Sequence, residues 1–466
     1  MDLIHKKKLG FKLKSNWQEL DNKSIFFTYT KDTEKFKKFE ILCIKKNCSH
    51  IICDNSFKKT ITKNIKINYL FTKDLNKFAI KCTDIFFDNK TKIILVTGTN
   101  GKTSIAYSLY NRLNKLFIKT SYIGTLGFYA NRKKIKKLSN TTPDLITLMN
   151  SIQESIKKYK CKYVILEASS IGFVEKRLGG IKADFGVLTN LTQDHIDYHG
   201  SILNYHKTKI KLLKNHLNKN SNLLIQDSIN IKYHKELSKK FNIIDQNKYL
   251  KNNSIQLIKS KVVNTNLFIN NFLIKKFNFP NNFVIKNLLS NYICLKAMNM
   301  KFNPKIVFNN TIIKGRHHII LDKADKLVIV DFAHTPDGVN NLLLPYNDVN
   351  CNKIVIFGCG GDRDKNKRSK MSKLVNKLSD FQIITDDNPR NENPEDIRAE
   401  LIKHCDNFYN IGDRLKAIKK GFFLLEKYKG ILFIIGKGHE ETQSYKNKIY
   451  KFSDIKESLK IAKSIN

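Results

Sequence analysis

The sequence predicts an α/β protein whose main sheets are parallel. Seven apolar runs are continuous rather than alternating, which is typical of strands buried on both faces. Each run ends in a polar or glycine-rich string: LVTGTNGKT, YVILEASS, FGVLTNLTQDH, LVIVDFAHTPD, IVIFGCGGDRD, IITDDNPR and LFIIGKGHE. Ligands of parallel sheets bind beyond the carboxyl ends of the strands, so we expect these strings to form the binding sites.

Three domains are expected from the distribution of these strings. Residues 1–90 alternate short apolar runs with lysine-rich connectors and indicate a small N-terminal α/β domain without a motif of its own. Residues 91–310 hold the first three strings, a segment rich in Asn and Lys, and a helix-like run at 287–298. Residues 311–466 hold the other four strings and are expected to form a C-terminal α/β domain.

The formal net charge of +43 raises the question of a nucleic-acid partner, because lysines that neutralise phosphates drive such binding. Lysine is abundant along the whole chain of 466 residues rather than on one face or tail, and it far outnumbers arginine. Drift toward AT-rich codons produces this pattern. The composition therefore does not favour a nucleic-acid partner.

The sequence indicates neither secretion nor a membrane partner. Its start has no apolar segment long enough for a signal peptide, and no run of about 18 apolar residues occurs further on. The nine cysteines are scattered without a C-x-x-C pair, which argues against a disulfide framework or a structural zinc site. We expect a cytoplasmic protein.

The central prediction is a phosphate-binding loop at 98–103. An apolar run that ends at Val96 is followed by GTNGKT and then by residues with helical spacing. The glycines let backbone N–H groups turn toward an anion, Lys102 neutralises phosphate oxygens, and the Thr103 hydroxyl suits Mg2+. Val96 stands where the general pattern has a glycine, so this is a shortened variant; an ordinary glycine-rich turn is the alternative.

The next two strings carry hydroxyls and a carboxylate. The run from Asn140 to Asp144, NTTPD, is predicted to open a helix, and its hydroxyls can equally bind a polar substrate. Glu167 follows a strand-like run and has Ser169 and Ser170 beside it. A carboxylate at a strand end beside a phosphate loop can hold Mg2+ directly or through water.

The string at 189–200 is dense in acidic residues and histidines. Asp194, His195 and Asp197 favour a metal or phosphate site. His195 and His199 are four residues apart and can face one metal, although such a pair is also a common structural feature. The helix predicted to follow carries Lys207, Lys209 and Lys211, and nothing local distinguishes them from a solvated lysine face.

The C-terminal strings contain two of the few arginines, Arg363 and Arg390. The planar guanidinium suits bidentate binding of a carboxylate in a way that lysine does not. This suggests a substrate that carries carboxylates, and Glu440 can pair with an ammonium group on the same substrate. An ordinary surface ion pair is the alternative for either arginine.

Taken in order, the strings resemble the Mur ligase family, the ATP-dependent amide-forming ligases of peptidoglycan precursor synthesis. The resemblance covers residues 92–443. TGTNGKT is shared across the family and its folate-ligating relatives, whereas NTTPD, TNLTQDHIDYHG, DFAHTPD, GCGGDRD, DNPR and GKGHE resemble the member that adds meso-2,6-diaminopimelate. The resemblance implies a monomer with an N-terminal uridine-nucleotide domain, a central P-loop-type ATP-binding domain and a Rossmann-like C-terminal amino-acid-binding domain.

The resemblance also implies roles for individual residues. ATP would contact Gly98, Thr99, Asn100, Gly101, Lys102, Thr103, Asn287, Arg316, Asp331 and His334. Mg2+ would be held by Thr103, Glu167, His195 and Lys209, the last aligning with a lysine that is carbamylated in the family; Lys102, His195 and Lys209 would be catalytic. The UDP-linked substrate would contact Thr141, Thr142 and Ser169, and diaminopimelate would contact Arg363, Asp387, Asn388, Arg390, Gly436 and Glu440.

The implied reaction begins when ATP phosphorylates the D-glutamate side-chain carboxylate of UDP-N-acetylmuramoyl-L-alanyl-D-glutamate. The diaminopimelate amine then attacks the acyl phosphate. Two alternatives are a related amide ligase of lysine-adding or folylpolyglutamate type, and a non-catalytic nucleic-acid-binding descendant. The chain departs from the family at Ile171, usually a histidine, at Val284, usually an asparagine, and at His318, usually an acidic residue.

Overall fold

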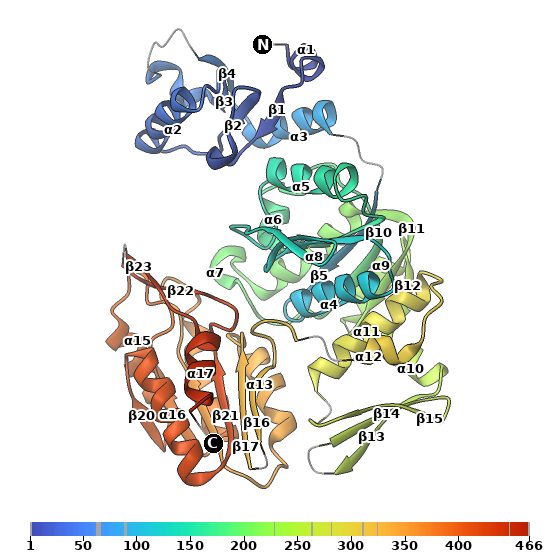
Figure 1. The fold of residues 1–466 in the computed structure, drawn as a ribbon, viewed down its shortest axis with the longest axis vertical. Coiled ribbons are helices and arrows are strands. Elements are labelled where there is room, and N and C mark those ends of the chain that lie inside the picture. The colour runs from blue at the N-terminus through green and yellow to red at the C-terminus, as the bar shows by residue number, and fades with distance from the viewer. Residues whose placement is uncertain are drawn as a thin grey trace.

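The computed structural model describes residues 2–61, 67–87, 91–227, 229–261, 264–280, 282–309, 312–323, 325–446 and 448–464. Figure 1 shows an elongated molecule in which the N-terminal part, the central part and the C-terminal part follow one another as separate bodies. The α/β class and the three-domain arrangement predicted from the sequence are confirmed. We propose the domain boundaries near residues 90 and 310; residues 88–90 and 310–311 lie outside the described part of the chain.

The N-terminal domain is a small parallel sheet covered on both faces. Its strands, in spatial order, are β1 (Lys12–Lys14), β2 (Ser24–Phe27), β3 (His50–Asp54) and β4 (Asn68–Thr72), and its helices are α1 (Leu3–Lys8), α2 (Thr33–Lys45) and α3 (Leu75–Phe86). Successive β3 residues alternate: Ile51 belongs to the core beside α2, and Ile52 to the core beside α3. One of the short apolar runs of this domain, FEILCI at 39–44, lies in helix α2.

The central sheet is parallel around the predicted phosphate loop. Its order is β12 (Asn242–Asp245), β11 (Leu217–Ile225), β10 (Ala183–Leu188), β5 (Lys92–Thr97), β9 (Tyr163–Glu167), β6 (Thr120–Gly124), β7 (Gly127–Ala130) and β8 (Lys133–Lys136). Strands β12 to β6 pair in parallel, and β7 and β8 add an antiparallel edge. In β5, Leu95 faces one core and Val96 the other, so the strand is apolar on both faces.

Helices cover both faces of this sheet, as Figure 1 shows. The helices of the central domain are α4 (Lys102–Lys115), α5 (Leu145–Lys157), α6 (Ser170–Val174), α7 (Ile196–His199), α8 (Ile202–His216), α9 (Ile231–Ser238), α10 (Gln246–Asn252), α11 (Phe283–Ala297) and α12 (Pro304–Phe308). Asp144 caps α5 by accepting from Thr147 N, which confirms the predicted helix start. Lys207, Lys209 and Lys211 lie on α8 as expected.

An antiparallel meander that the sequence did not predict follows the central sheet. It consists of β13 (Ile255–Lys261), β14 (Asn264–Ile269) and β15 (Phe272–Phe277). Leu267 and Phe277 join the core formed by α4 and α11, whereas Phe272 is exposed. Alternating burial in a segment rich in Asn and Lys leaves no continuous apolar run to recognise.

The C-terminal domain repeats the two-faced arrangement. Its sheet order is β16 (His318–Lys323), β17 (Lys326–Asp331), β21 (Gly430–Ile435), β18 (Lys353–Phe357), β19 (Phe381–Ile384) and β20 (Phe408–Asn410). All pairs are parallel except β16 with β17. The remaining elements are α13 (Pro336–Leu343), α14 (Asn366–Leu378), α15 (Pro394–Ile402), α16 (Arg414–Tyr428), α17 (Asp454–Ala462) and the hairpin β22 (Thr442–Tyr445) and β23 (Lys448–Lys451).

Within the described residues, no helix is long and apolar enough to cross a bilayer. The nine cysteines are free thiols, and eight of them are buried.

His317 joins the central and C-terminal domains. Its Nε2 lies 2.7 Å from Tyr346 Oη, and its backbone N–H donates to Asp331 Oδ2 at 2.6 Å. On the other side its ring packs against Phe279 and Phe283 of the central domain. The imidazole is only 8% exposed, so this junction is stabilised by a neutral buried histidine.

We expect acid to weaken this junction. Burial lowers the pKa of His317 to about 4, so the unfolded chain takes up a proton that the folded chain excludes. The free energy of unfolding therefore keeps the full contribution of His317 above about pH 6.5. It decreases by about 3 kcal/mol as the pH falls toward 4. Urea unfolding at pH 7 and pH 4.5 measures this loss. His317→Gln should lose less stability over this interval than the wild type; equal losses would contradict the prediction.

Candidate active site

The phosphate loop lies between β5 and α4, and the string after β10 holds its shape. Gly98 and Gly101 have φ values of 143° and 84°. Asn100 N donates to Asn190 Oδ1 at 2.9 Å, and Thr189 Oγ1 donates to Asn100 O at 2.6 Å. The loop is therefore set before a ligand binds, with the N-terminus of α4 facing the cavity described below.

Two lysines converge on the carbonyl of Gly98. Lys102 Nζ donates to it at 2.9 Å, and Lys209 Nζ, from α8, donates at 2.8 Å. Burial and the charge of Lys102 lower the pKa of Lys209 well below its usual value, and burial also lowers that of Lys102. An anion bound at this loop would relieve the mutual repulsion of the two ammonium groups.

Glu167 is fully buried at the end of β9 beside this loop. Its Oε2 accepts from Thr103 Oγ1 at 2.9 Å and from Thr125 Oγ1 at 3.1 Å, and its Oε1 accepts from Tyr122 Oη and from Thr125 N. Its backbone oxygen accepts from Thr142 Oγ1 at 2.9 Å. The carboxylate is thus held in one orientation next to the Thr103 hydroxyl.

The donor set suits a hard cation such as Mg2+. Glu167 and Thr103 present oxygen atoms, and Mg2+ in phosphate sites is usually bound through one or two carboxylates, waters and substrate phosphates. No cluster of three or more His, Cys, Asp or Glu that could hold a metal occurs within the described ranges. His199 Nε2 contacts Ser170 Oγ at 3.0 Å, so His199 is used within the fold.

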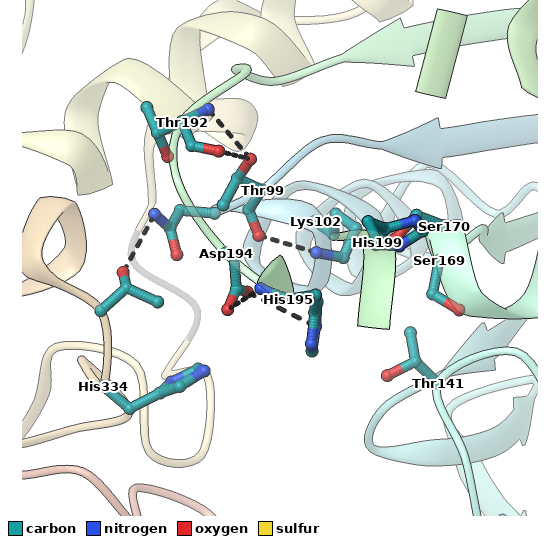
Figure 2. A network of polar contacts seen from close by, with 12 residues as sticks. Thr99, Lys102, Thr141, Ser169, Ser170, Thr192, Asp194, His195, His199 and His334 are labelled. Atoms are coloured by element: carbon teal, nitrogen blue, oxygen red, sulfur yellow. Dashed lines mark hydrogen bonds and ion pairs between the residues drawn. The ribbon is translucent and has the colours of Figure 1, made fainter. Parts of the chain in front are cut away.

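Asp194 and His195 lie on the other side of the loop. His195 Nε2 is 3.4 Å from Asp194 Oδ2, and burial lowers the pKa of His195 although Asp194 opposes the change. Burial raises the pKa of Asp194, but the positive charges of His195, His334, Lys367 and Lys102 outweigh it and lower the value. Figure 2 shows His334, from the C-terminal domain, facing Asp194 and His195.

Residues of the C-terminal domain form the second wall of the site. Asp337 Oδ2 accepts from Asn100 Nδ2 of the phosphate loop at 2.7 Å. Arg316 stacks on the Phe332 ring with its guanidinium 4.3 Å from the ring centre. A cavity of about 370 Å3 results, within the usual range for small-molecule sites. Its walls include nine of the ten predicted ATP-binding residues: Thr99, Asn100, Gly101, Lys102, Thr103, Asn287, Arg316, Asp331 and His334.

The residues predicted to bind diaminopimelate lie in the segments that follow β18, β19 and β21. Asn388 Nδ2 donates to Glu440 Oε2 at 2.9 Å and to Asp387 Oδ1 at 3.1 Å. A Cβ on Gly436 would lie 2.7 Å from Asp387 Oδ2. Arg390 Nη1 donates to Gly361 O at 2.7 Å; burial and the nearby charge of Arg363 lower its pKa. Arg363 itself is exposed.

Two family models match the chain: the Mur ligase middle domain over residues 96–295, and the Mur ligase glutamate ligase domain over residues 315–438. A relative from Helicobacter pylori, named UDP-N-acetylmuramoyl-L-alanyl-D-glutamate--2,6-diaminopimelate ligase, is 34% identical over 79% of this chain and 83% of its own. Relatives with the same name from Buchnera aphidicola and Rickettsia conorii are 33% and 32% identical, over 95% and 97% of this chain and 93% and 95% of theirs.

The chain belongs to the Mur ligase family.

Solved structures of Mur ligases share the fold. The MurF ligase from Thermotoga maritima in complex with ADP superposes with a TM-score of 0.68 at 14% identity, covering 100% of this chain and 98% of its own. A Mycobacterium tuberculosis folylpolyglutamate synthase complexed with ADP and AMPPCP has a TM-score of 0.61 at 13% identity, covering 78% and 92%. The family resemblance inferred from the motifs is confirmed.

The residues predicted to contact the UDP-linked substrate lie near Glu167. Thr141 lines the cavity, and its Oγ1 is 2.9 Å from Thr125 Oγ1. Thr142 is fully buried, and its Oγ1 accepts from Ser169 N at 2.9 Å while it donates to Glu167 O. Because the Thr142 hydroxyl is satisfied within this Mur ligase, we expect it to hold the loop in place and Thr141 to be the more accessible group.

Several residues that contact the predicted site were not singled out in the sequence. Tyr122 and Thr125 hold Glu167, Arg177 Nη1 donates to Thr142 O at 2.9 Å, and Asp337 contacts the phosphate loop. Asp337 could have been found from the sequence, because it belongs to the polar string DFAHTPD. Tyr122, Thr125 and Arg177 lie outside the polar strings of this Mur ligase, so no local pattern indicated them. Of the departures from the family, Val284 packs on the central core, and Ile171 lies in α6.

Gly98→Ala should weaken nucleotide binding. A Cβ at this φ of 143° would lie 1.8 Å from Thr189 Oγ1, and Thr189 holds the loop carbonyl of Asn100. Displacement of Thr189 and strain in the loop backbone are expected to reduce the affinity for ATP about tenfold or more. Titration calorimetry measures this affinity. Gly10→Ala is the control, because Gly10 has φ 81° but nothing within 4 Å of its Cβ position. Equal ATP affinity in both variants would contradict the prediction.

Proposed function

We propose that the chain is the ligase that joins meso-2,6-diaminopimelate to the D-glutamate side-chain carboxylate of UDP-N-acetylmuramoyl-L-alanyl-D-glutamate, in peptidoglycan precursor synthesis. The observation that carries the proposal is a phosphate-loop cavity walled by two domains, together with a polar cluster in the C-terminal domain that combines Arg390 with Asn388 and Glu440. Curated relatives with this activity in their names, at 31–34% identity, support it.

ATP is the nucleotide that this cavity would bind. The backbone of 98–103 and Lys102 would hold the phosphates, while Asn287, Asp331 and Arg316 would approach the rest of the nucleotide. Thr103, Glu167, His195 and Lys209 would hold Mg2+, which supplies positive charge beside the transferred phosphoryl group. Lys102 would stabilise the charge that develops during phosphoryl transfer.

Lys209 would reach the metal only as a carbamate. Its lowered pKa favours the neutral amine, the form that can attack CO2, and the reaction forms an N–C bond and releases one proton. The product is a carboxylate in place of an ammonium group. We therefore propose that carbamylation replaces the repulsion between Lys209 and Lys102 with attraction.

The C-terminal pocket would recognise the end of diaminopimelate that does not react. Arg390, with Arg363 near it, would pair with the carboxylate, and Glu440 and Asn388 would accept and orient the ammonium group. Lysine lacks this second carboxylate and would leave Arg390 unpaired. A site built to bind a polar group rejects an analogue that lacks it more strongly than an apolar pocket does.

The reaction then needs both domains. Glutamate carboxylate oxygen attacks the ATP γ-phosphorus, ADP leaves, and an acyl phosphate forms. The diaminopimelate amine attacks the carbonyl carbon, loses a proton, and the C–O bond to phosphate breaks. Because the groups proposed for the nucleotide and for diaminopimelate lie on different domains, closure would bring amine and acyl phosphate together. We propose that the protein acts as a monomer in the cytoplasm.

Phosphate release from ATP tests the reaction. With Mg2+ and UDP-N-acetylmuramoyl-L-alanyl-D-glutamate present, we expect release on addition of meso-diaminopimelate and far less with L-lysine. Release with lysine would indicate a lysine-adding ligase, and release with a folate substrate and glutamate a folylpolyglutamate-type enzyme. If no phosphate is released with any of these substrates and the protein binds RNA or DNA in a salt-dependent way, the nucleic-acid-binding alternative would be favoured.

Arg390→Ala should remove the discrimination against lysine. Loss of the carboxylate partner is expected to raise the KM for diaminopimelate by about 100-fold, while ATP affinity stays at the wild-type level because Arg390 is not among the residues that line the nucleotide cavity. Initial rates over a range of diaminopimelate concentrations measure the effect. Arg132→Ala, in the turn between β7 and β8, is the matched control. An unchanged KM in Arg390→Ala would exclude the proposed recognition.

A further inference from the structure

Lys437, like Lys209, is a buried lysine. It follows β21 and stands between Gly436 and Gly438, which have φ values of 109° and 50°. Its side chain is completely inaccessible to solvent. Burying an ammonium group costs free energy unless it is paired and hydrogen-bonded, so the contacts of Lys437 are informative.

Lys437 contacts two of the residues that are proposed to bind diaminopimelate. Lys437 Nζ donates to Glu440 Oε2 at 3.0 Å and to Asn388 Oδ1 at 3.2 Å. Asn388 Nδ2 donates to the same Glu440 Oε2 at 2.9 Å. Lysine, amide and carboxylate therefore form a closed triangle of hydrogen bonds.

The triangle determines which way the Asn388 amide faces. Its oxygen accepts from Lys437 Nζ and from Ser444 N at 3.0 Å, and its nitrogen donates to Asp387 and Glu440. The reversed amide would place its N–H2 group against an ammonium group and a backbone N–H. Lys437 thus excludes the reversed orientation.

Lys437 also leaves one oxygen of Glu440 available. Lys437 and Asn388 both donate to Oε2 of this carboxylate, and no hydrogen bond from the described part of the chain reaches Oε1. The Glu440 side chain is 33% exposed. Oε1 can therefore accept from an ammonium group of a ligand while Oε2 stays anchored.

We propose that Lys437 is a positioning residue for the amino-acid substrate, an inference that rests on the proposed function. It does not touch the substrate. It holds Asn388 and Glu440 in the geometry that receives the ammonium group of the unreacted end of diaminopimelate, and it balances one of the two carboxylate charges of Asp387 and Glu440. The substrate then meets a pocket that is already ordered.

Lys437→Met tests the inference, because methionine is unbranched and of similar length but cannot donate. We expect the KM for meso-diaminopimelate to rise about tenfold or more, as when a charge-assisted hydrogen bond is lost. The kcat and the KM for ATP should change by less than about threefold, because the nucleotide cavity does not include Lys437. Lys314→Met is the matched control: Lys314 pairs with Glu441 at 2.6 Å on the surface of the same region.

A double-mutant cycle separates positioning from a general structural effect. If Lys437 acts through Glu440, Lys437→Met should raise the KM for diaminopimelate much less in a Glu440→Gln background than in the wild type. The same factor in both backgrounds, or an unchanged KM in Lys437→Met, would overturn the inference. If Lys437→Met fails to fold, Lys437→Gln replaces it. Absence of turnover by the wild type would instead overturn the proposed function.

Discussion

The convergence of Lys102 and Lys209 on the Gly98 carbonyl is the constraint on which the site depends. Burial lowers the pKa of both lysines, and the charge of Lys102 lowers the pKa of Lys209 further. Thr189 can pack against the loop because Gly98 has no side chain: a Cβ there would lie 1.8 Å from Thr189 Oγ1. The string after β10 and the phosphate loop are therefore mutually dependent.

The same loop is tied to the C-terminal domain. Asn100 Nδ2 donates to Asp337 Oδ2 at 2.7 Å, so a residue of the phosphate loop already links the two domains. His317 adds a buried contact at the junction. Because a ligase must join substrates held apart, a junction made of a few specific contacts allows closure without loss of alignment.

The arginines of the C-terminal domain fall into two kinds: some are paired within the fold, and others are left for a substrate. Arg414 makes a fully buried pair with Asp454, Nε to Oδ1 at 2.7 Å, and also donates to the backbone oxygens of Asp386 and Ile435. It thereby holds the ends of β19 and β21 together. Arg390 and Arg363 lie near each other, and among the described residues neither forms a direct ion pair with a carboxylate, which is the arrangement expected of groups that bind a substrate carboxylate.

Local pattern was sufficient to predict the parallel strands, the phosphate loop, the start of helix α5 and the strings that form the site. Each of these depends on residues adjacent in sequence: continuous apolar runs, glycines before a lysine, or Asp144 before a helical run. The sequence did not predict the meander β13–β15, because its buried residues alternate with polar ones and form no continuous apolar run. FEILCI, a short apolar run that by itself does not distinguish a helix from a strand, lies in helix α2.

The family resemblance singled out Lys209, but only the tertiary structure showed that it is buried and separated Lys437 from the many other lysines of this chain. Burial of a lysine depends on what distant segments place around it: Gly98 for Lys209, and Asn388 with Glu440 for Lys437. It also showed that the Thr142 hydroxyl is used within the fold and that Asp337 meets the phosphate loop. Residue type and spacing determine which chemistry is present, whereas the packing of segments far apart in sequence decides which groups are buried, paired or left for a substrate.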